Sequence, residues 1–441
     1  MEPTNIFRAV LLGNWIVFLW DLYLSWRQYK VHERNARRPN EVADLITEED
    51  YNKARSYKLD KHRFSFAQGI YGQLLTTVVL CYQFLPKLWY LCDGLPLQSV
   101  AFTVLSSLVS TVVDLPWSLY DTFVIEEKHG FNKQTLGFYL KDTVKKLVVS
   151  SLLTTPIVYG LEWIVLYGGE YFFVYTWLFV SVIIFVLMTI YPAFIAPLFD
   201  KYIPLPDGPL KTAIEQLAAS VSYPLTKLYV VHGSKRSAHS NAYMYGFWKN
   251  KRIVLYDTLL SGEEKEKVIK ECAEAGEEKQ DEKEKARGMS NDEVVAVLGH
   301  ELGHWALSHT VINLIITELN IFIMFYAFSY LYKWNNLYEC FGFTDTPVII
   351  GFILVFQFVM APYHQIDGFL MNMHSRRCEF QADEYANQLG FGPQLITALK
   401  KLSKDNLSMP IDDIWYSTFN HSHPPIIERV RAINEYKAKA Q

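Results

Sequence analysis

Cysteine is scarce in this sequence, and several patterns that identify common protein classes are missing. The 441 residues contain five cysteines and no Cys-x-x-Cys pair, so neither a disulfide scaffold nor a cysteine zinc cluster is indicated. One disulfide bond, between Cys92 and Cys340, is an alternative that the sequence leaves open. The net charge is −4 and no basic block stands clear of acidic neighbours, so we expect no nucleic-acid partner. No glycine-rich phosphate loop and no internal repeat are evident.

Apolar residues, by contrast, are abundant. Half of the chain is hydrophobic, 15% is aromatic, and the mean hydropathy of +0.05 is high for a soluble protein. Seven apolar segments are long enough to cross a hydrocarbon core of ~30 Å, at 7–24, 66–85, 98–117, 147–167, 171–194, 311–331 and 347–367. We therefore predict a mainly α-helical, polytopic membrane protein with seven transmembrane helices. The first segment lacks a small-residue cleavage site, which favours a retained helix over a signal peptide.

The distribution of lysine and arginine predicts the orientation, because cationic loops stay cytosolic. The loop between the first two segments contains ten such residues, and the loop between the third and fourth contains five. The loops after the second, fourth and sixth segments carry little beyond Lys87 and Lys333. We expect a lumenal N-terminus and a cytosolic C-terminus. The predicted division is five helices in 1–196, a cytosolic part in 197–310, two helices in 311–367 and a second cytosolic part in 368–441.

Polar residues inside the predicted spans are costly in lipid and should face one another or a hydrated interior. Several occur, including Asn14, Gln73, Asp114, Glu162, Glu318, Asn320, Gln357 and His364. From these residues alone, hydrogen bonds between helices and a hydrated cavity are equally open explanations. In the cytosolic part, 263–287 is dense in glutamate and lysine without an apolar stripe, which predicts a solvated helix or a disordered loop.

A metal-binding motif, His-Glu-Leu-Gly-His, precedes the sixth span. Residues 290–293 fit a capping box, so we predict a helix that starts there and continues unbroken into the membrane as far as Tyr332. His300 and His304 are four residues apart and share one face, as two imidazole ligands of one zinc ion must. Glu301 can act as general base on the metal-activated water. Two surface histidines on a capped helix are the alternative.

A catalytic zinc ion needs a third protein ligand and an open position. The segment 375–390, SRRCEFQADEYANQLG, predicts a helix that ends at a glycine. We predict Glu379 as the third ligand, and Asp383, four residues later, as the carboxylate that accepts the second N–H of a ligand histidine. Asp367, in an Asp-Gly pair, would be the ligand in an intramembrane protease, but the charged stretch before the motif favours a site at the membrane surface. Weaker rivals without an equally placed partner are Cys378, His364, His374 and Glu384.

A hairpin is predicted before the charged segment, from β-rich stretches at 242–245 and 253–256 joined across 249–251. An extended peptide could add to its free edge and be held by backbone hydrogen bonds. The alternative is a hairpin that only packs on the helices of the metal motif.

Four segments together resemble the type I CAAX prenyl endopeptidase family of integral-membrane zinc metalloproteases. They are GSKRSAHSNAYMYG at 233–246, HELGHW at 300–305, SRRCEFQAD at 375–383 and HPPIIER at 423–429. The resemblance extends over nearly the whole chain. It implies seven helices that enclose a large hydrated chamber, capped by a cytosolic zinc domain with a small sheet.

The resemblance also implies roles for individual residues. The family's ligands for one Zn²⁺ per chain match His300, His304 and Glu379, its catalytic base matches Glu301, and its supporting carboxylate matches Asp383. A histidine and an arginine that approach the active site in relatives, to steady the oxyanion or the substrate carbonyl, match His423 and Arg429. The family's substrate cleft matches Asn241, so we predict substrate contacts from Asn241, Ala242 and Tyr243. Relatives often have a histidine and an aromatic residue where this chain has Asn420 and His421.

As a member of this family, the chain would be an endopeptidase that removes the aaX tripeptide from farnesylated proteins ending in Cys-a-a-X. A second upstream cut is known for some family substrates. The prenyl chain keeps such a substrate at the bilayer, because each buried CH₂ contributes ~0.8 kcal/mol. The alternatives are a quality-control protease for misfolded proteins and a translocation factor for stalled chains. The tail at 437–441 has a K-x-K-x-x pattern typical of retrieval to the endoplasmic reticulum, so we expect the protein in that membrane, with the inner nuclear membrane as an additional location. We expect a monomer.

Overall fold

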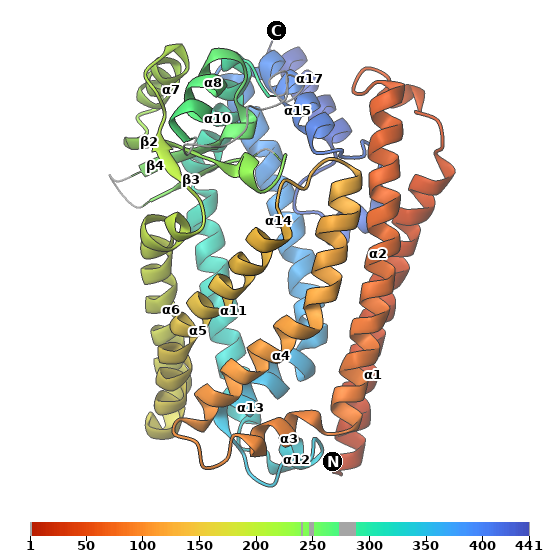
Figure 1. The fold of residues 1–441 in the computed structure, drawn as a ribbon, viewed down its shortest axis with the longest axis vertical. Coiled ribbons are helices and arrows are strands. Elements are labelled where there is room, and N and C mark those ends of the chain that lie inside the picture. The colour runs from red at the N-terminus through yellow and green to blue at the C-terminus, as the bar shows by residue number, and fades with distance from the viewer. Residues whose placement is uncertain (1, 240, 247–250, 273–287, 441) are drawn as a thin grey trace.

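Long helices run along the longest axis of the protein, and a smaller mixed α/β part covers one end of them (Figure 1). The computed structural model describes residues 2–239, 241–246, 251–272 and 288–440. Six helical segments of this described part are long and apolar enough to cross a membrane. They are built on α1 (Pro3–Arg34), α2 (Glu48–Cys81), α4 (Gln98–Tyr120), α5 (Leu136–Tyr167), α6 (Phe172–Ile190) and α11 (His309–Leu331). The two chain ends lie at opposite ends of the molecule (Figure 1).

These helices present apolar side chains outward. Only 6–11% of the residues in their most apolar windows are buried, and large side chains such as Leu152, Phe194 and Tyr330 are exposed. A soluble protein rarely exposes apolar surface on this scale, whereas a membrane protein presents it to lipid. The predicted mainly helical, polytopic fold is confirmed.

The seventh predicted span is bent. α13 (Val348–Phe352) runs into a π-helical turn at Ile353–Val359, and α14 (Ala361–Gln388) leaves that turn at an angle of 62°. Pro362, in the first turn of α14, has no backbone N–H, so it suits the start of a new helix and cannot donate a hydrogen bond back to the preceding turn. The bundle therefore has six spans, or seven if the bent pair forms one span. α14 then extends well beyond residue 367, where the predicted span ends.

The prediction of one unbroken helix from the metal motif into the membrane is wrong. α10 (Asn291–Ala306) ends before α11 begins, and Ser308 between them has a left-handed backbone with a φ of 59°. A left-handed residue interrupts the hydrogen-bond pattern of a right-handed helix. The start of α10 is as predicted, since Ser290 N–H donates to Glu293 Oε2 at 2.8 Å and the reciprocal hydrogen bond of the capping box is present.

A four-stranded sheet lies beside α10. Its strands follow the order β1 (Tyr202–Pro204), β2 (Leu225–Val231), β4 (Lys251–Tyr256) and β3 (Ala242–Tyr245). β3 pairs antiparallel with β4, with Ala242 opposite Leu255, which confirms the predicted hairpin. Its turn at 247–250 lies outside the described residues. A buried cluster that includes Leu210 of α7 (Pro209–Ser220), Ile253 and Leu298 joins the sheet to α10, so the edge strand β3 is held at a fixed position relative to the metal motif.

Polar residues inside the spans form hydrogen bonds between helices at several places. Glu162 of α5 accepts one from Ser99 of α4 at 2.6 Å. Glu318 of α11 accepts one from Trp177 Nε1 of α6 at 3.0 Å. Hydrogen bonds between helices thus account for these two residues. They do not account for all the polar residues of the spans, because Asp114 is bonded to Ser110 of its own helix and Gln73 Nε2 is buried without a partner in the described part of the chain.

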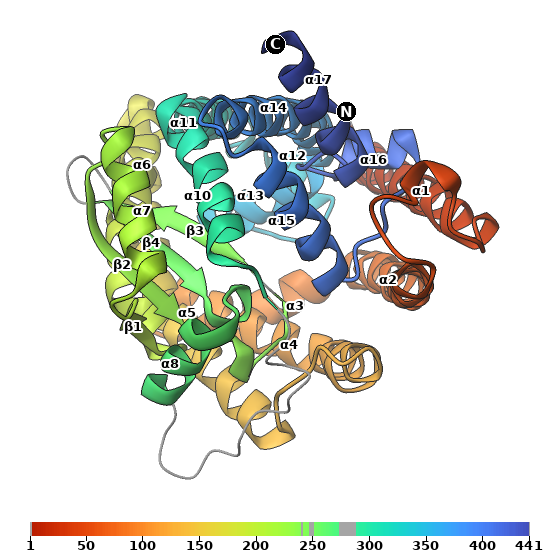
Figure 2. The same cartoon turned by 90° about the horizontal axis from the view of Figure 1, so that it is seen from above.

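The C-terminal helices α15 (Gly392–Asp405), α16 (Ile414–Asn420) and α17 (Ile426–Ala440) return to the end of the bundle where α10 lies (Figure 2). Short helices α3 (Phe84–Leu91) and α12 (Asn335–Glu339) lie at the other end (Figure 1). α8 (Gly262–Cys272) covers the first part of the charged segment, and the rest of that segment falls outside the described residues. Cys92 and Cys340 are both free thiols.

Candidate metal centre

α10 presents His300 and His304 on one face, as their spacing of four residues predicts. Their Nε2 atoms lie 3.2 Å apart. Gly303 lies between them, where α10 crosses α14, and a Cβ atom at this position would be 3.0 Å from the Cα atom of Ala382. The glycine therefore permits the close approach of the two helices that the site requires.

α14 brings Glu379 to the two histidines. Its Oε1 lies 3.3 Å from His304 Nε2 and its Oε2 lies 3.5 Å from His300 Nε2. All three candidate ligand atoms lie within 4.8 Å of one another. Each carboxylate oxygen of Glu379 therefore faces an imidazole nitrogen of the pair, at a distance that one shared metal ion would bridge. Two imidazoles and one carboxylate are a ligand set of catalytic zinc, so the donor chemistry fits that ion.

Among the described residues, none of the rival third ligands joins the two histidines in a group of potential metal-binding atoms. Asp367 accepts a hydrogen bond from Asn320 Nδ2 at 2.8 Å inside the helix bundle. His374 Nε2 and Cys378 Sγ lie 3.6 Å from each other. Within the described ranges, one group of three metal-binding side chains is gathered closely enough, and it consists of His300, His304 and Glu379.

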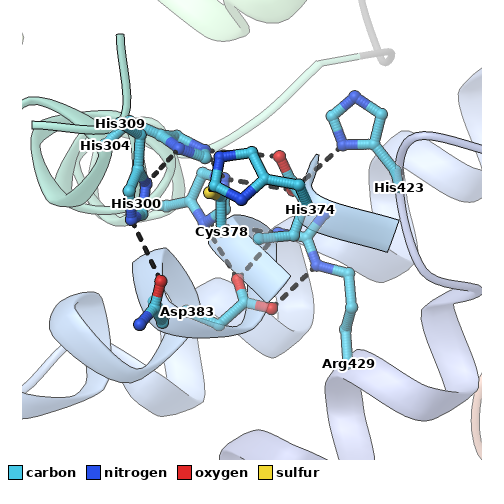
Figure 3. A network of polar contacts seen from close by, with 10 residues as sticks. His300, His304, His309, His374, Cys378, Asp383, His423 and Arg429 are labelled. Carbon is cyan, nitrogen blue, oxygen red and sulfur yellow. Dashed lines mark hydrogen bonds and ion pairs between the residues drawn. The ribbon is translucent and has the colours of Figure 1, made fainter. Parts of the chain in front are cut away.

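Asp383 and Arg429 lie behind the first histidine (Figure 3). Asp383 Oδ1 is 2.9 Å from His300 Nδ1. Asp383 also accepts two hydrogen bonds from Arg429, one from Nη2 to Oδ1 at 2.7 Å and one from Nε to Oδ2 at 2.8 Å. This bidentate pair compensates a fully buried carboxylate. Burial alone would lower the pKa of His300, but its hydrogen bonds with Asp383 and Glu379 outweigh burial and raise the pKa to about 9.

The predicted carbonyl-binding residues also meet Glu379. Arg429 Nη1 lies 3.4 Å from Glu379 Oε2, and its other two nitrogens are committed to Asp383. His423 Nδ1 lies 2.9 Å from the same oxygen, and the His423 side chain is 66% exposed. Arg429 is therefore directed at the supporting carboxylates, whereas His423 has room to move.

A cavity of about 700 Å³ opens beside these residues. His300, Glu301 and Glu379 line one side of it, and residues of α1 and α2 line another. Asn241 and Ala242, at the start of the edge strand, line it too. The Tyr243 side chain instead contacts Tyr202, with the two hydroxyl oxygens 3.1 Å apart. Glu301 and the beginning of β3 therefore line the same cavity.

The sequence analysis missed two polar residues beside the second histidine. His309 Nδ1 lies 3.0 Å from His304 Nδ1, and His309 Nε2 lies 3.2 Å from Gln381 Oε1. A further histidine five residues after His304, just before an apolar span, is the signal that could have identified the first of them. Gln381 stands between Glu379 and Asp383 and has no such signal.

Two family profiles match successive parts of the chain. The profile described as "CAAX prenyl protease N-terminal, five membrane helices" matches residues 28–201, and that of "Peptidase family M48" matches residues 204–437. The CAAX prenyl protease 1 homolog of Caenorhabditis elegans is 61% identical over 100% of both chains. That of Homo sapiens is 47% identical over 98% of this chain and 96% of its own. The crystal structure of S. mikatae Ste24p has a TM-score of 0.85 at 36% identity, covering 98% of this chain and 99% of that one.

Proposed function

This chain belongs to peptidase family M48 and is a multi-pass membrane metalloprotease. We propose that it removes the C-terminal aaX tripeptide from farnesylated proteins ending in Cys-a-a-X. The observation that carries the proposal is the group of two imidazoles and one carboxylate beside Glu301, on a cavity reached by an edge strand. The relatives named CAAX prenyl protease 1 homologues, which match the chain over nearly its whole length, support the substrate class.

The metal proposed for the site is one Zn²⁺ per chain, held by His300, His304 and Glu379. When bound, zinc lowers the pKa of a coordinated water to about 7 and polarises a carbonyl group. Glu301 lines the same cavity and would take a proton from the attacking water. It would then deliver that proton to the leaving amine as the peptide bond breaks.

Three further residues, Asp383, Arg429 and His423, would each support the reaction in a different way. Asp383 accepts the Nδ1–H of His300, which leaves His300 Nε2 free for the metal. Arg429 holds Asp383 with two hydrogen bonds, so we assign it mainly to fixing that carboxylate. His423 is exposed and contacts Glu379; once Glu379 binds the metal, the His423 ring would be free to donate to the substrate carbonyl.

The unpaired edge of β3 would hold the substrate backbone. Asn241 and Ala242 line the cavity, and β3 is the last strand in the sheet order. A peptide that adds to this edge is bound through main-chain groups, which suits a substrate whose two a positions vary. Tyr243 would contribute its backbone, because its side chain contacts Tyr202.

The proposed topology follows from charge and composition. The cationic loops favour a cytosolic site, a cytosolic C-terminus and a lumenal N-terminus. The tail pattern favours residence in the endoplasmic reticulum. We propose a monomer that takes its substrate from the bilayer, with a hydrated chamber between the helices below the site. The division at 1–196, 197–310, 311–367 and 368–441 belongs to this proposal.

The replacement Glu301→Gln tests the mechanism. We expect it to keep the fold and the bound metal and to lower cleavage of a farnesylated Cys-a-a-X peptide at least 10²- to 10⁴-fold, because the general base is lost. The measurement is product formation by purified protein, with metal content determined on the same samples. Retained turnover in a metal-loaded variant would contradict the assignment of Glu301.

The substrate class needs a separate comparison. Matched farnesylated and unmodified peptides distinguish a prenyl-dependent protease from a quality-control protease, which would cleave both. Purified wild-type protein with less than about half a metal ion per chain would instead favour a translocation factor without catalysis.

A further inference from the structure

His304 has a polar partner on the side that faces away from the proposed metal. Its Nε2 is the metal-facing nitrogen, because this atom lies 3.2 Å from His300 Nε2 and 3.3 Å from Glu379 Oε1. Its Nδ1 lies 3.0 Å from Nδ1 of His309, which is only 4% exposed, and His309 Nε2 lies 3.2 Å from Gln381 Oε1. In Figure 3, His309 lies beside His304, on the opposite side of the network from His423 and Arg429.

Only one arrangement of protons satisfies these contacts and leaves His304 able to bind a metal. A neutral His304 that coordinates through Nε2 must carry its proton on Nδ1. That N–H donates to His309 Nδ1, so the proton of a neutral His309 is on Nε2, from which it donates to Gln381 Oε1. With the Gln381 amide reversed, the same chain would put the His304 proton on Nε2 and block coordination.

We propose that His309 and Gln381 are positioning residues that fix His304 in its metal-binding tautomer and orientation. The inference rests on the proposed metal-binding triad and extends it to residues that touch neither metal nor substrate. Because Gln381 is on α14 and His309 is the first residue of α11, the two contacts also connect three helices at the second ligand.

The two ligand histidines are supported in different ways. His300 faces the carboxylate of Asp383, whereas His304 faces the imidazole of His309, which in turn contacts the neutral amide of Gln381. Glu301, Glu379 and Asp383 already surround the centre with carboxylates. A neutral partner orients His304 without adding another negative charge, so more of the positive charge of a bound ion remains available to the water and the substrate carbonyl.

Three substitutions in the full-length purified protein test the proposal. His309→Leu removes the acceptor and retains most of the volume, His309→Asn keeps an acceptor oxygen near the position of Nδ1, and Gln381→Met removes the second acceptor. We expect metal to bind about 10- to 100-fold more weakly in His309→Leu, within about threefold of wild type in His309→Asn, and between the two in Gln381→Met. The readouts are the Zn²⁺ dissociation constant by chelator competition and the visible spectrum of the Co²⁺-substituted protein.

Thr310→Leu is the matched control, because Thr310 is the next residue in α11 and is exposed; its metal affinity should equal that of wild type. Wild-type affinity in His309→Leu would overturn the proposal, and so would a folded His309→Asn that binds metal as weakly as His309→Leu. If His309→Leu does not fold, Gln381→Met, which retains His309, decides the question. Failure of the wild type to bind metal would instead overturn the proposed triad.

Discussion

The hydrogen bond between His300 and Asp383 makes metal affinity depend on pH. A metal binds only the deprotonated imidazole, and in the metal-free protein the pKa of His300 is raised from 6.5 to about 9. The protonated form contributes stability that is fully present below the unfolded-state pKa and is lost as pH rises through about 9. Below about pH 9, protons therefore compete with the metal for this side chain.

We expect the apparent metal affinity to fall by up to about tenfold per pH unit between pH 9 and pH 6.5. In Asp383→Asn, the pKa of His300 should move back towards its ordinary value, so the contribution of His300 to this dependence should appear only at lower pH. Chelator competition at several pH values, with the protonation of the chelator taken into account, measures both slopes. Equal slopes in the two proteins would contradict the assignment.

At the scale of helices, the approach of α10 to α14 depends on Gly303. A methyl group at this position would lie 3.0 Å from Ala382 Cα and 3.1 Å from Tyr385 Cβ, which is closer than packed side chains normally approach. Because Ala382 is fully buried, the clash cannot be relieved by moving a flexible side chain. The two helices would have to separate, and Glu379 would move away from the histidines.

The replacement Gly303→Ala should therefore cost about 1–3 kcal/mol of stability through overpacking and should weaken metal binding. Gly368→Ala, on the partner helix α14, is the matched control, because a methyl group there meets no atom within 4 Å and alanine favours the helix. Thermal unfolding in detergent and metal affinity are the measurements. Wild-type values for Gly303→Ala would show that the contact does not control the site.

Local sequence signals predicted the features that depend on local physics. The capping box at Ser290 and the hairpin at 242–256 follow from short-range hydrogen bonds and alternation, and Gly390, with a φ of 89°, follows α14 as predicted. The break at Ser308 had no glycine or proline to indicate it, and apolar residues continue on both sides. Pro362 was visible, but the surrounding apolar run concealed the bend.

The same distinction applies to the candidate site. Spacings of four residues predicted which side chains of one helix share a face, so His300 with His304, and Glu379 with Asp383, could be paired from sequence. The contact between His309 and Gln381 joins residues 72 positions apart. It depends on how α11 leaves the break at Ser308, which is a matter of tertiary packing that helical periodicity does not determine.

For the whole molecule, the two chain ends lie at opposite ends of the bundle (Figure 1), and the proposed orientation, which rests on the loop charges, has the C-terminal end in the cytosol. The chain contains two Asn-x-Ser glycosylation sequences, at Asn406 and Asn420, both on the proposed cytosolic side. We expect neither to be modified in cells. An Asn-Gly-Thr tag added at the N-terminus should be glycosylated, and the same tag at the C-terminus should not. A shift in mobility removed by glycosidase is the measurement, and the reverse pattern would contradict the orientation.

The left-handed residue Ser308 separates the membrane helix α11 from the helix that holds two of the proposed metal ligands. Long apolar helices respond to changes in bilayer thickness by tilting, and α11, with 23 residues, is about 35 Å long. In a rigid rod of that length a tilt of about 10° displaces the end by about 6 Å, far more than a metal site tolerates. Because α10 is a separate helix packed against α14, tilting of α11 about Ser308 need not rotate His300 and Glu301. His309 contacts His304 from α11, but it is the residue next to Ser308 and would be displaced least. The site can therefore keep one geometry in membranes of different thickness.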